Sequence, residues 1–383
     1  MMVLVALGSL SLLSLLVWRG PPTAVPIDGE THRLMQARSA LIEYAVSYPQ
    51  NYHSSSAGPG KFPCPDTNGN GNSGPRCAAL AMGLLPRDFA TSLGAVQELQ
   101  HDTSTATEPL WWVVAGPYRN RPAPSGSPSH AMVLNSDTVP VLTLDGVADV
   151  IGLVIAPGPP LAGQARLPGT VRVEDYLEGE NADGDTAFSR AAGNDRIVAI
   201  RWRDVMPLVE RQAVAAVRAS VRGYYLAHGR FPHLGRLGAL DSAGDLPCSA
   251  CHMQGWVSVP RYRAAAGAAT MQTCVDALGG AVEQPVVDLP AWLVRNFWHT
   301  RVWLHLAGDD CGAAPRVDGR AVSGVFVGVG PPLEMPPSGV RQTRAVPALE
   351  HYLDHPVNTD GDHLYTRYPG GNDTWVLLSP GAP

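Results

Sequence analysis

The sequence is short of charged and aromatic residues, and this excludes several classes of protein. Charged residues make up 16% and aromatic residues 7% of the 383 positions, and Lys61 is the only lysine. No run of basic residues occurs and the formal net charge is −6, so the composition gives no electrostatic reason to expect a nucleic-acid partner. Hydrophobic residues make up 45% of the chain, which is the balance of a globular protein.

Common sequence signatures of catalysis are also missing. The chain contains no G-x-S-x-G and no G-x-x-x-x-G-K-[ST], the patterns of a nucleophile elbow and of a phosphate-binding loop. Serine, histidine and aspartate are scattered without a recognisable nucleophile. We therefore expect a protein that is not an enzyme and needs no cofactor.

The N-terminus carries a long apolar segment. Its first 18 residues, MMVLVALGSLSLLSLLVW, have no charge and are followed by Arg19. At 1.5 Å per residue a helix of this length reaches across a hydrocarbon core. The pattern predicts a membrane anchor at 1–20 and a linker at 21–30; a cleaved secretory signal is the alternative. Under either interpretation the rest of the chain is exported. The anchor predicts a protein held in the inner membrane with the bulk of its chain in the periplasm.

The second half of the chain repeats the first. Gly158-Pro159-Pro160-Leu161 corresponds to Gly330-Pro331-Pro332-Leu333, and Gly193-Asn194-Asp195 corresponds to Gly371-Asn372-Asp373. Matches of this kind in the same order indicate a duplicated unit. We expect one module at 31–203 and another at 204–383.

Each copy has the pattern of a helix followed by strands. Apolar residues recur at helical spacing in LMQARSALIEYAVSYPQ and in PLVERQAVAAVRASVRGYYLAHGRFP. Strand-like segments follow, among them LWWVVAG and RVWLHLAG, then DVIGLVIAPG and VSGVFVGVG. Helix followed by strands predicts an α+β fold, with each long helix packed on a mainly antiparallel sheet.

Six cysteines, an even number, suit an oxidising compartment. They are Cys64, Cys77, Cys248, Cys251, Cys274 and Cys311. The repeat aligns Cys248 and Cys251 with Cys64 and Cys77, which predicts one disulfide in each copy and a third between the two remaining cysteines. The spelling Cys248-Ser249-Ala250-Cys251-His252 is also that of c-type haem attachment, so a redox or haem role is the alternative.

The repeated pattern N-x-D-G-D is the best candidate for a metal site. Oxygen ligands alternating around a glycine suit calcium, although Asp-Gly is also a favoured turn. The candidate ligands are Asn181, Asp183, Asp185 and Asp195 in the first copy and Asn358, Asp360, Asp362 and Asp373 in the second.

Several segments resemble pilin-like and pseudopilin-like envelope proteins of Gram-negative bacteria. The resemblance rests on ALIEYAVSYPQ, KFPCPDTNGNG, GLLPRDF and LWWVVAG, and it is best over residues 34–202. It implies two tandem pilin-like modules behind the N-terminal membrane helix. Some pseudopilins carry a calcium near the last loops of the sheet, which here implies Asp183, Asp185 and Asp195 or their counterparts.

The resemblance also implies a role. It is that of a membrane-anchored periplasmic protein which serves as a minor or accessory component of a pilus or type II secretion-like apparatus. Its expected partners are other proteins of that apparatus and the inner membrane, with no nucleic acid.

Overall fold

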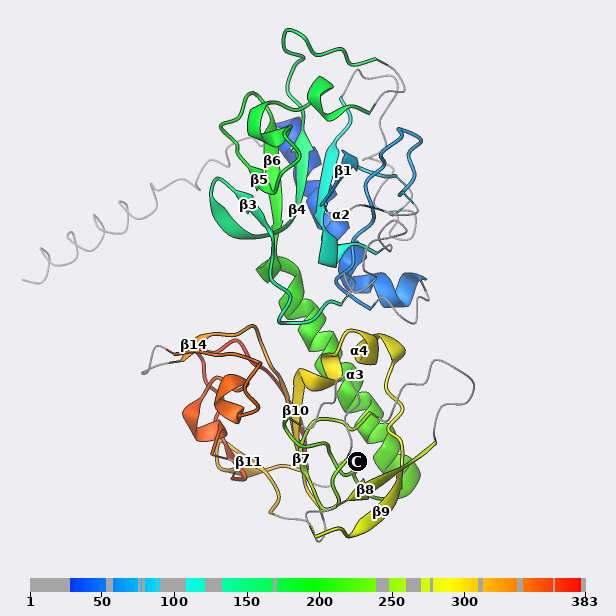
Figure 1. The fold of residues 1–383 in the computed structure, drawn as a ribbon, viewed down its shortest axis with the longest axis vertical. Coiled ribbons are helices and arrows are strands. Elements are labelled where there is room, and N and C mark those ends of the chain that lie inside the picture. The colour runs from blue at the N-terminus through cyan, green and yellow to red at the C-terminus, as the bar shows by residue number, and fades with distance from the viewer. Residues whose placement is uncertain are drawn as a thin grey trace, which may run out of the picture.

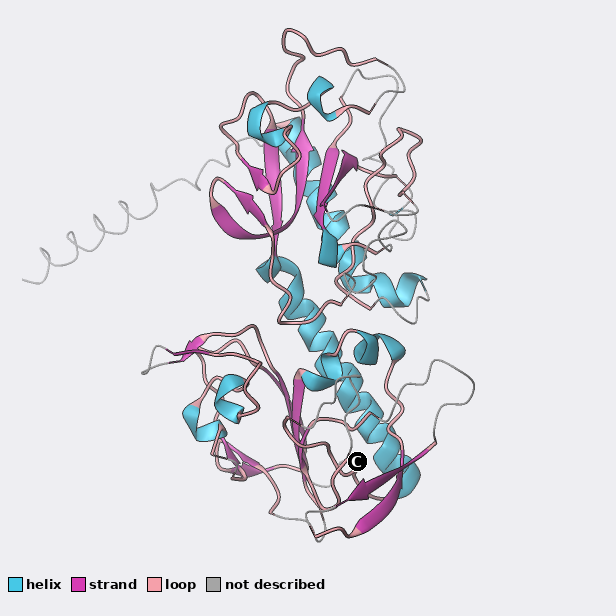
Figure 2. Cartoon of the chain, in the orientation of Figure 1, coloured by secondary structure: helices cyan, strands magenta, loops and turns pink. Residues whose placement is uncertain are grey.

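A computed structural model describes most of the chain after residue 27. The described residues are 28–52, 58–74, 77, 80–87, 89, 108–120, 133–167, 171–238, 248–259, 270–275, 278–308, 313–335, 340–360 and 362–379. They form two halves joined by helix α3 (Trp202–His228), which runs from one half into the other (Figure 1). Figure 2 shows that sheet and loop make up most of both halves.

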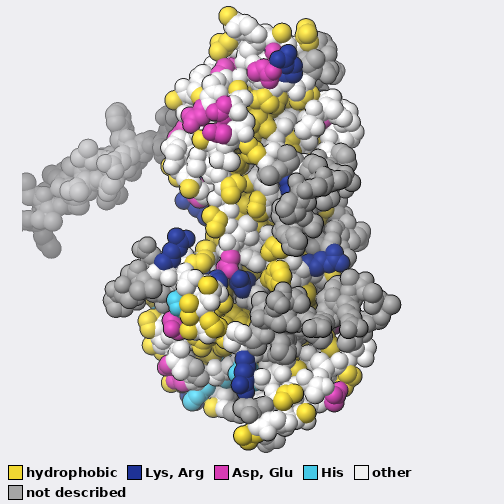
Figure 3. Space-filling model, in the orientation of Figure 1, with side chains coloured by type: hydrophobic (Ala, Val, Ile, Leu, Met, Phe, Trp, Pro, Cys, Tyr) yellow, Lys and Arg dark blue, Asp and Glu magenta, His cyan; other side chains and the backbone are white. Residues whose placement is uncertain are grey.

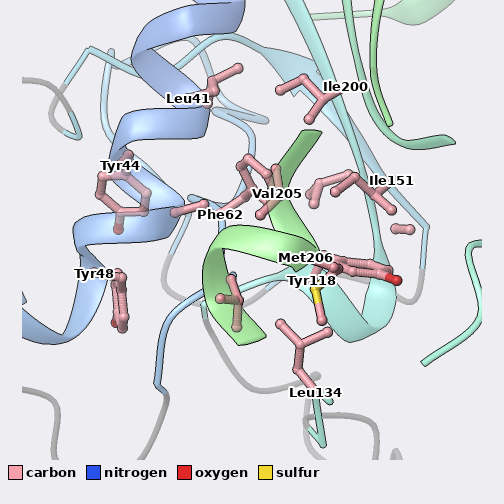
Figure 4. Packing of buried hydrophobic residues seen from close by; sticks show 14 of the residues in the cluster. Leu41, Tyr44, Tyr48, Phe62, Tyr118, Leu134, Ile151, Ile200, Val205 and Met206 are labelled. Atoms are coloured by element: carbon pink, nitrogen blue, oxygen red, sulfur yellow. The ribbon is translucent and has the colours of Figure 1, made fainter. Parts of the chain in front are cut away.

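Helix α2 (Gly29–Tyr52) covers the sheet of the first half. Asp28 accepts a hydrogen bond from the backbone N–H of Thr31 at 2.8 Å, which caps the start of the helix. Leu34, Leu41 and Tyr44 recur at helical spacing and are buried. Helix α2 packs against strands β4 and β6 and against α3, and Figure 4 shows this contact.

The first half is built on a six-stranded sheet. Its strands are β1 (Leu80–Leu84), β2 (Trp111–Ala115), β3 (Leu142–Leu144), β4 (Val147–Ala156), β5 (Ala187–Phe188) and β6 (Arg196–Arg201). The order is β1-β2-β4-β3-β5, and β6 also pairs with β4. Every pair is antiparallel except β3 with β5. All five residues of β2 are buried, so this strand is covered on both faces.

Helix α3 begins directly after β6 and belongs to both halves. The Asp204 carboxylate accepts the backbone N–H of Arg201 at 2.7 Å, and Gly229 ends the helix at a left-handed φ of 70°. The helix contacts β4 and β6 in the first half and β10, β13 and β17 in the second. One hydrophobic core therefore runs continuously from Leu34 to Leu378.

The second half contains four smaller sheets. The largest has the order β17-β13-β10-β7, and all its pairs are antiparallel. Its strands are β7 (Gln254–Gly255), β10 (Val302–Leu306), β13 (Gly324–Gly328) and β17 (Thr374–Leu378). The others are β8 (Met271–Val275) with β9 (Ala281–Pro285), β11 (Arg316–Val317) with β12 (Arg320–Ala321) and β16 (Leu364–Tyr365), and β14 (Glu334–Met335) with β15 (Val340–Arg341). A short helix, α4 (Ala291–Arg295), precedes β10.

The strand registers of the two halves correspond. Ile155 of β4 lies opposite Ile197 of β6, and Val327 of β13 lies opposite Trp375 of β17. A parallel pair recurs as well, β3 with β5 in the first half and β11 with β16 in the second. The order β1-β2-β4-β6 thus matches β7-β10-β13-β17.

Hydrogen bonds and ion pairs tie the two halves together beside α3. The carboxylate of Asp137 accepts from Arg301 at 2.5 Å and from Arg344 at 3.3 Å. Close by, Asn135 donates to the backbone carbonyl of Asn296 at 2.9 Å. Asp137 and Asn135 belong to the first half and the other three residues to the second, so the loop before β3 is attached to both halves.

The predicted fold class is wrong. The described residues form five sheets and three α-helices, not an N-terminal membrane helix followed by two pilin-like modules. The 40 glycines and 35 prolines interrupt regular pairing, so many strands have two or three residues and are joined by 3-10 turns. The sheets also include parallel pairs, and α3 serves two sheets at once.

The predicted location in the inner membrane is also corrected. The proposed anchor, residues 1–20, lies outside the described residues. Within the described ranges, no helix is long and apolar enough to cross a membrane. The disulfides support only the broader statement that the chain occupies an oxidising environment.

Candidate functional site

The N-x-D-G-D segments lie in two equivalent loops, one in each half. In the first, the Asn181 side chain accepts the N–H of Ser189 at 2.9 Å and donates to its carbonyl at 3.0 Å. In the second, Asn358 makes the same pair of bonds to Thr366, at 2.8 and 2.9 Å. Both asparagines are buried. Each side-chain amide therefore closes its own loop, because it makes the two backbone hydrogen bonds that a residue of a neighbouring strand would make.

The aspartates that follow bind the backbone of their own turns. Asp183 accepts the N–H of Asp185 at 3.1 Å, and Asp185 accepts the N–H of Ala187 at 2.7 Å. Asp360 accepts the N–H of Asp362 at 3.1 Å, and Asp362 accepts the N–H of Leu364 at 2.6 Å. These are Asx turns. Figure 3 shows acidic side chains gathered on the first half in this region.

A carboxyl pair lies beneath each loop, and one member of each pair, Asp195 or Asp354, is buried. In the first half, Asp195 accepts from the Asn181 amide at 3.2 Å and from the backbone N–H of Glu178 at 3.3 Å. Glu178 in turn accepts the backbone N–H of Asn194 at 3.1 Å. Burial, with a smaller contribution from the Glu178 charge, raises the pKa of Asp195 to about 7. The pair therefore retains a proton at a pH at which exposed carboxyls are ionised.

The second half has the corresponding pair with a third carboxyl added. Asp354 accepts the backbone N–H groups of Asn372 at 2.6 Å and Asp373 at 3.1 Å, and its own N–H donates to Asp373 at 2.9 Å. Burial raises the pKa of both aspartates, and for Asp373 the charges of Asp354 and Glu210 add to this effect. Burial also raises the pKa of Glu210, on α3, to about 8.

The repeated Gly-Pro-Pro and Gly-Asn-Asp segments contact each other. Asn194 donates to the carbonyl of Pro159 at 2.9 Å, and a Cβ added to Gly158 would lie 2.1 Å from the Asn194 side-chain oxygen. Asn372 and Gly330 repeat this arrangement, with the same 2.9 Å and 2.1 Å. Each glycine is therefore required because the asparagine side chain occupies the space of a Cβ.

The predicted calcium ligands are only partly brought together. Asn181 and Asp195 are in contact, while Asp183 and Asp185 are used by the amides of their turn, and the second half is arranged likewise. Among the residues that the structure describes, no group of three or more His, Cys, Asp or Glu side chains could hold a metal. Calcium binding stays a prediction from the sequence.

The disulfide pairing differs from the prediction in the second half. Cys64 is bonded to Cys77 as predicted, but Cys248 is bonded to Cys274 instead of Cys251. Cys251 is also disulfide-bonded, and Cys311 lies outside the described residues. Cys274 is in β8, and the hairpin of β8 and β9 places it beside Cys248. The repeat could not predict this pairing because a segment as long as this hairpin had no recognised counterpart in the first copy.

This pairing bears on the alternative hypothesis of a haem or redox site. Haem attachment through C-x-x-C-H needs two free thiols, and Cys248 and Cys251 are both in disulfides. Burial, helped by the charge of Arg236, lowers the pKa of His252. Its backbone is used locally, since its carbonyl accepts the N–H of Leu234 at 2.7 Å.

The sequence pointed to the loops but missed three carboxyls of the site, Glu178, Asp354 and Glu210. Glu178 and Asp354 were visible as equivalent acidic residues after Tyr-Leu in the repeat, which was a usable signal. Glu210 gave no signal, because a glutamate on an amphipathic helix is ordinarily exposed.

Comparison with known proteins does not identify a family or a function for this site. No protein-family model matches the chain, and neither the search of curated proteins nor that of solved structures finds a match.

Proposed function

We propose that the chain is a non-enzymatic protein that acts through contacts with other proteins. Its place would be that of a minor or accessory component of a pilus or type II secretion-like apparatus, in an oxidising compartment. The assignment to such an apparatus rests on the resemblance of the sequence, and the mode of action rests on the geometry of the loops.

One observation carries the proposal: the same hydrogen-bonded loop is built twice, and in each copy a buried asparagine holds it closed. Asn181 and Asn358 hold the loops closed, and one carboxyl of each pair beneath them, Asp195 or Asp354, is buried. Beside the exposed aspartates, apolar side chains are also exposed: Leu161 of the Gly-Pro-Pro-Leu segment is 46% exposed, and Leu364, at the end of the second loop, is 42% exposed. Rigid loops with apolar residues on the outside suit protein contact.

The disulfides support the choice of compartment. Each half carries at least one, Cys64–Cys77 and Cys248–Cys274. Such bonds persist where the environment is oxidising.

Site-specific photo-crosslinking in cells tests this proposal. A photoreactive residue at Leu161 or Leu364 is expected to capture proteins of a pilus or secretion assembly. The matched control is Leu278, which is 97% exposed in the turn between β8 and β9. If neither loop position captures a component of such an assembly, or Leu278 captures the same ones, the proposal fails.

A further inference from the structure

Strands β6 and β17 occupy equivalent places in the two halves, and their outer edges differ. Within the described ranges each is paired on one side only, β6 with β4 and β17 with β13. The registers are the same, so Ile197 and Ala199 of β6 correspond to Trp375 and Leu377 of β17. In an antiparallel pair, residues two apart direct both N–H and C=O to the same side.

Arginine side chains close the outer edge of β6. Arg38 of α2 donates from Nε to the carbonyl of Ala199 at 3.0 Å, and Arg190 donates to the carbonyl of Ile197 at 3.4 Å. Arg38 is held in place by Asp204, at 2.7 Å. The carbonyls at these two positions therefore face away from β4 and are bonded by side chains.

The edge of β17 has no such closure among the described residues. Arg367, which corresponds to Arg190, bonds through its Nε to Asp318 at 3.0 Å, and neither Trp375 nor Leu377 accepts a side-chain bond there. The strand itself, Thr374-Trp375-Val376-Leu377-Leu378, has no charged residue. An uncharged strand with an open edge is a template for another strand.

Arg218 is the counterpart of Arg38, and it has no partner in the described part of the chain. Buried Leu34, Leu41 and Tyr44 of α2 correspond in spacing to buried Val214, Val221 and Tyr224 of α3, which places Arg218 where Arg38 stands. Arg218 is partly exposed, makes no ion pair with any described residue, and has a buried Nε without a hydrogen bond.

The Nε of Arg218 is a buried donor without a described acceptor, which is unfavourable, while the residue as a whole is partly exposed. In the first half that acceptor is an edge carbonyl together with a carboxylate. The sequence position that corresponds to Asp204 is Ala382, which has no charged side chain and lies outside the described residues.

We propose that the outer edge of β17 binds an extended, acidic segment of a partner protein. The segment would add a strand to β17, using the outward N–H and C=O groups of Trp375 and Leu377, while a carboxylate on it would pair with Arg218. This inference rests on the proposed role in protein contacts, and it specifies the partner segment as extended and acidic. A second copy of β17 does not meet this need, because it brings another Arg218 and no acid.

Binding of model peptides tests the proposal in the full chain. The probe is the nine-residue peptide Thr-Val-Thr-Val-Glu-Val-Thr-Val-Thr, with the central Glu replaced by Gln or Lys in two matched peptides. The Glu peptide is expected to slow hydrogen exchange at the amides of Trp375 and Leu377 and to bind at least tenfold more tightly than the Lys peptide. No slowing at these amides with any of the three peptides would overturn the proposal.

Two variants separate the role of Arg218 from a general charge effect. Arg218→Gln is expected to remove the preference for Glu over Lys, and Arg218→Glu to reverse it. The control is Arg222→Gln, which removes an exposed arginine from the same helix and should leave the preference intact. Equal effects of the two Gln variants would contradict the pairing with Arg218.

Sedimentation without peptide completes the test. A dimer in which Trp375 and Leu377 are already protected from exchange would mean that a second copy occupies the edge, and would overturn the acidic-segment proposal. The peptide experiment and the crosslinking in cells test different proposals. If peptides bind to β17 but no envelope partner is captured in cells, only the proposed membership of a pilus or secretion apparatus is rejected.

Discussion

Glu30 and Glu210 occupy equivalent positions on α2 and α3, and their surroundings are opposite. Glu30 is partly exposed and pairs with Arg196 at 3.1 Å, at the start of β6. The residue in the place of Arg196 at the start of β17 is Thr374. Glu210 is 2% exposed, and one of its carboxyl oxygens has no hydrogen-bond partner.

The difference shows how a duplicated scaffold tolerates the loss of a charge partner. Without an arginine, Glu210 is accommodated by taking up a proton, as its pKa of about 8 indicates. The same fold therefore carries an ion pair in one half and an uncharged acid in the other. The edges of β6 and β17 differ in a similar way: Arg38 is bonded in the first half, and its counterpart Arg218 has no partner among the described residues of the second.

Removing a disulfide from each half is expected to have the largest effect. The pair of substitutions Cys64→Ala and Cys77→Ala should lower the free energy of unfolding by about 3 kcal/mol. Cys248→Ala with Cys274→Ala should cost about 0.5 kcal/mol more, because the sequence separation is 26 rather than 13. Urea unfolding of both double variants measures the two values, and a larger loss for the shorter loop would contradict this account.

The pH dependence of stability should distinguish Glu210 from Glu30. The folded pKa of Glu210 is about 8 against an ordinary value of 4.5, so the folded state binds the extra proton. Its contribution is complete below about pH 4.5 and is lost as the pH rises toward 8. Asp354, Asp373, Thr374 and Arg211 surround this carboxyl.

Glu210→Gln keeps the uncharged form at every pH. We expect it to stabilise the protein by roughly 2 kcal/mol at pH 9 relative to the parent chain and to have little effect at pH 4. The control is Glu30→Gln, which should not stabilise the protein at pH 9, because Glu30 pairs with Arg196. Urea unfolding at the two pH values gives the comparison, and a stabilisation by Glu30→Gln equal to that by Glu210→Gln would refute it.

The glycine–asparagine contacts should be equally sensitive in the two halves. Gly158→Ala and Gly330→Ala each place a Cβ 2.1 Å from an asparagine oxygen, and each should cost about 2 kcal/mol. Gly223→Ala, within α3 and with nothing within 4 Å of the added Cβ, should instead stabilise by about 0.5 kcal/mol. Thermal unfolding of the three variants checks this; a harmless Gly330→Ala would show that the second contact is not equivalent to the first.

The smallest effects are expected at the edge arginines. Arg38→Gln loses the bond to Ala199 and the pair with Asp204, which should cost about 1 kcal/mol. Arg218→Gln removes a group without a described partner, and the stability should change by less than about 0.5 kcal/mol. Equal losses measured by urea unfolding would mean that Arg218 is already engaged.

Some of the fold could be predicted because it depends on neighbours in the sequence. The structure has helices at Gly29–Tyr52 and Trp202–His228 where the apolar spacing predicted them. Strands β2 and β10 lie within the predicted segments. The Asp-Gly segments form turns, one of the alternatives that the sequence left open.

Other features could not be predicted because they depend on distant segments. The wrong pairing of Cys248 followed from treating the second copy as a shortened first copy, while the hairpin of β8 and β9 supplied Cys274. The fold class was wrong because the spacing of apolar residues does not show how many sheets a set of strands forms, or that α3 packs on two of them.

The sequence by itself determined the local parts of this protein: the amphipathic helices, the Asx turns, the Cys64–Cys77 loop and the repeated motifs. These are decided by the spacing of residues within a few turns of chain. Long-range packing places Glu210 beside Asp354 and Asp373, and it gives Arg38 a partner while Arg218 has none among the described residues. The physical reason is that burial and pairing of a charge depend on which segments meet in space, and residues with the same spacing acquire different neighbours in the two halves.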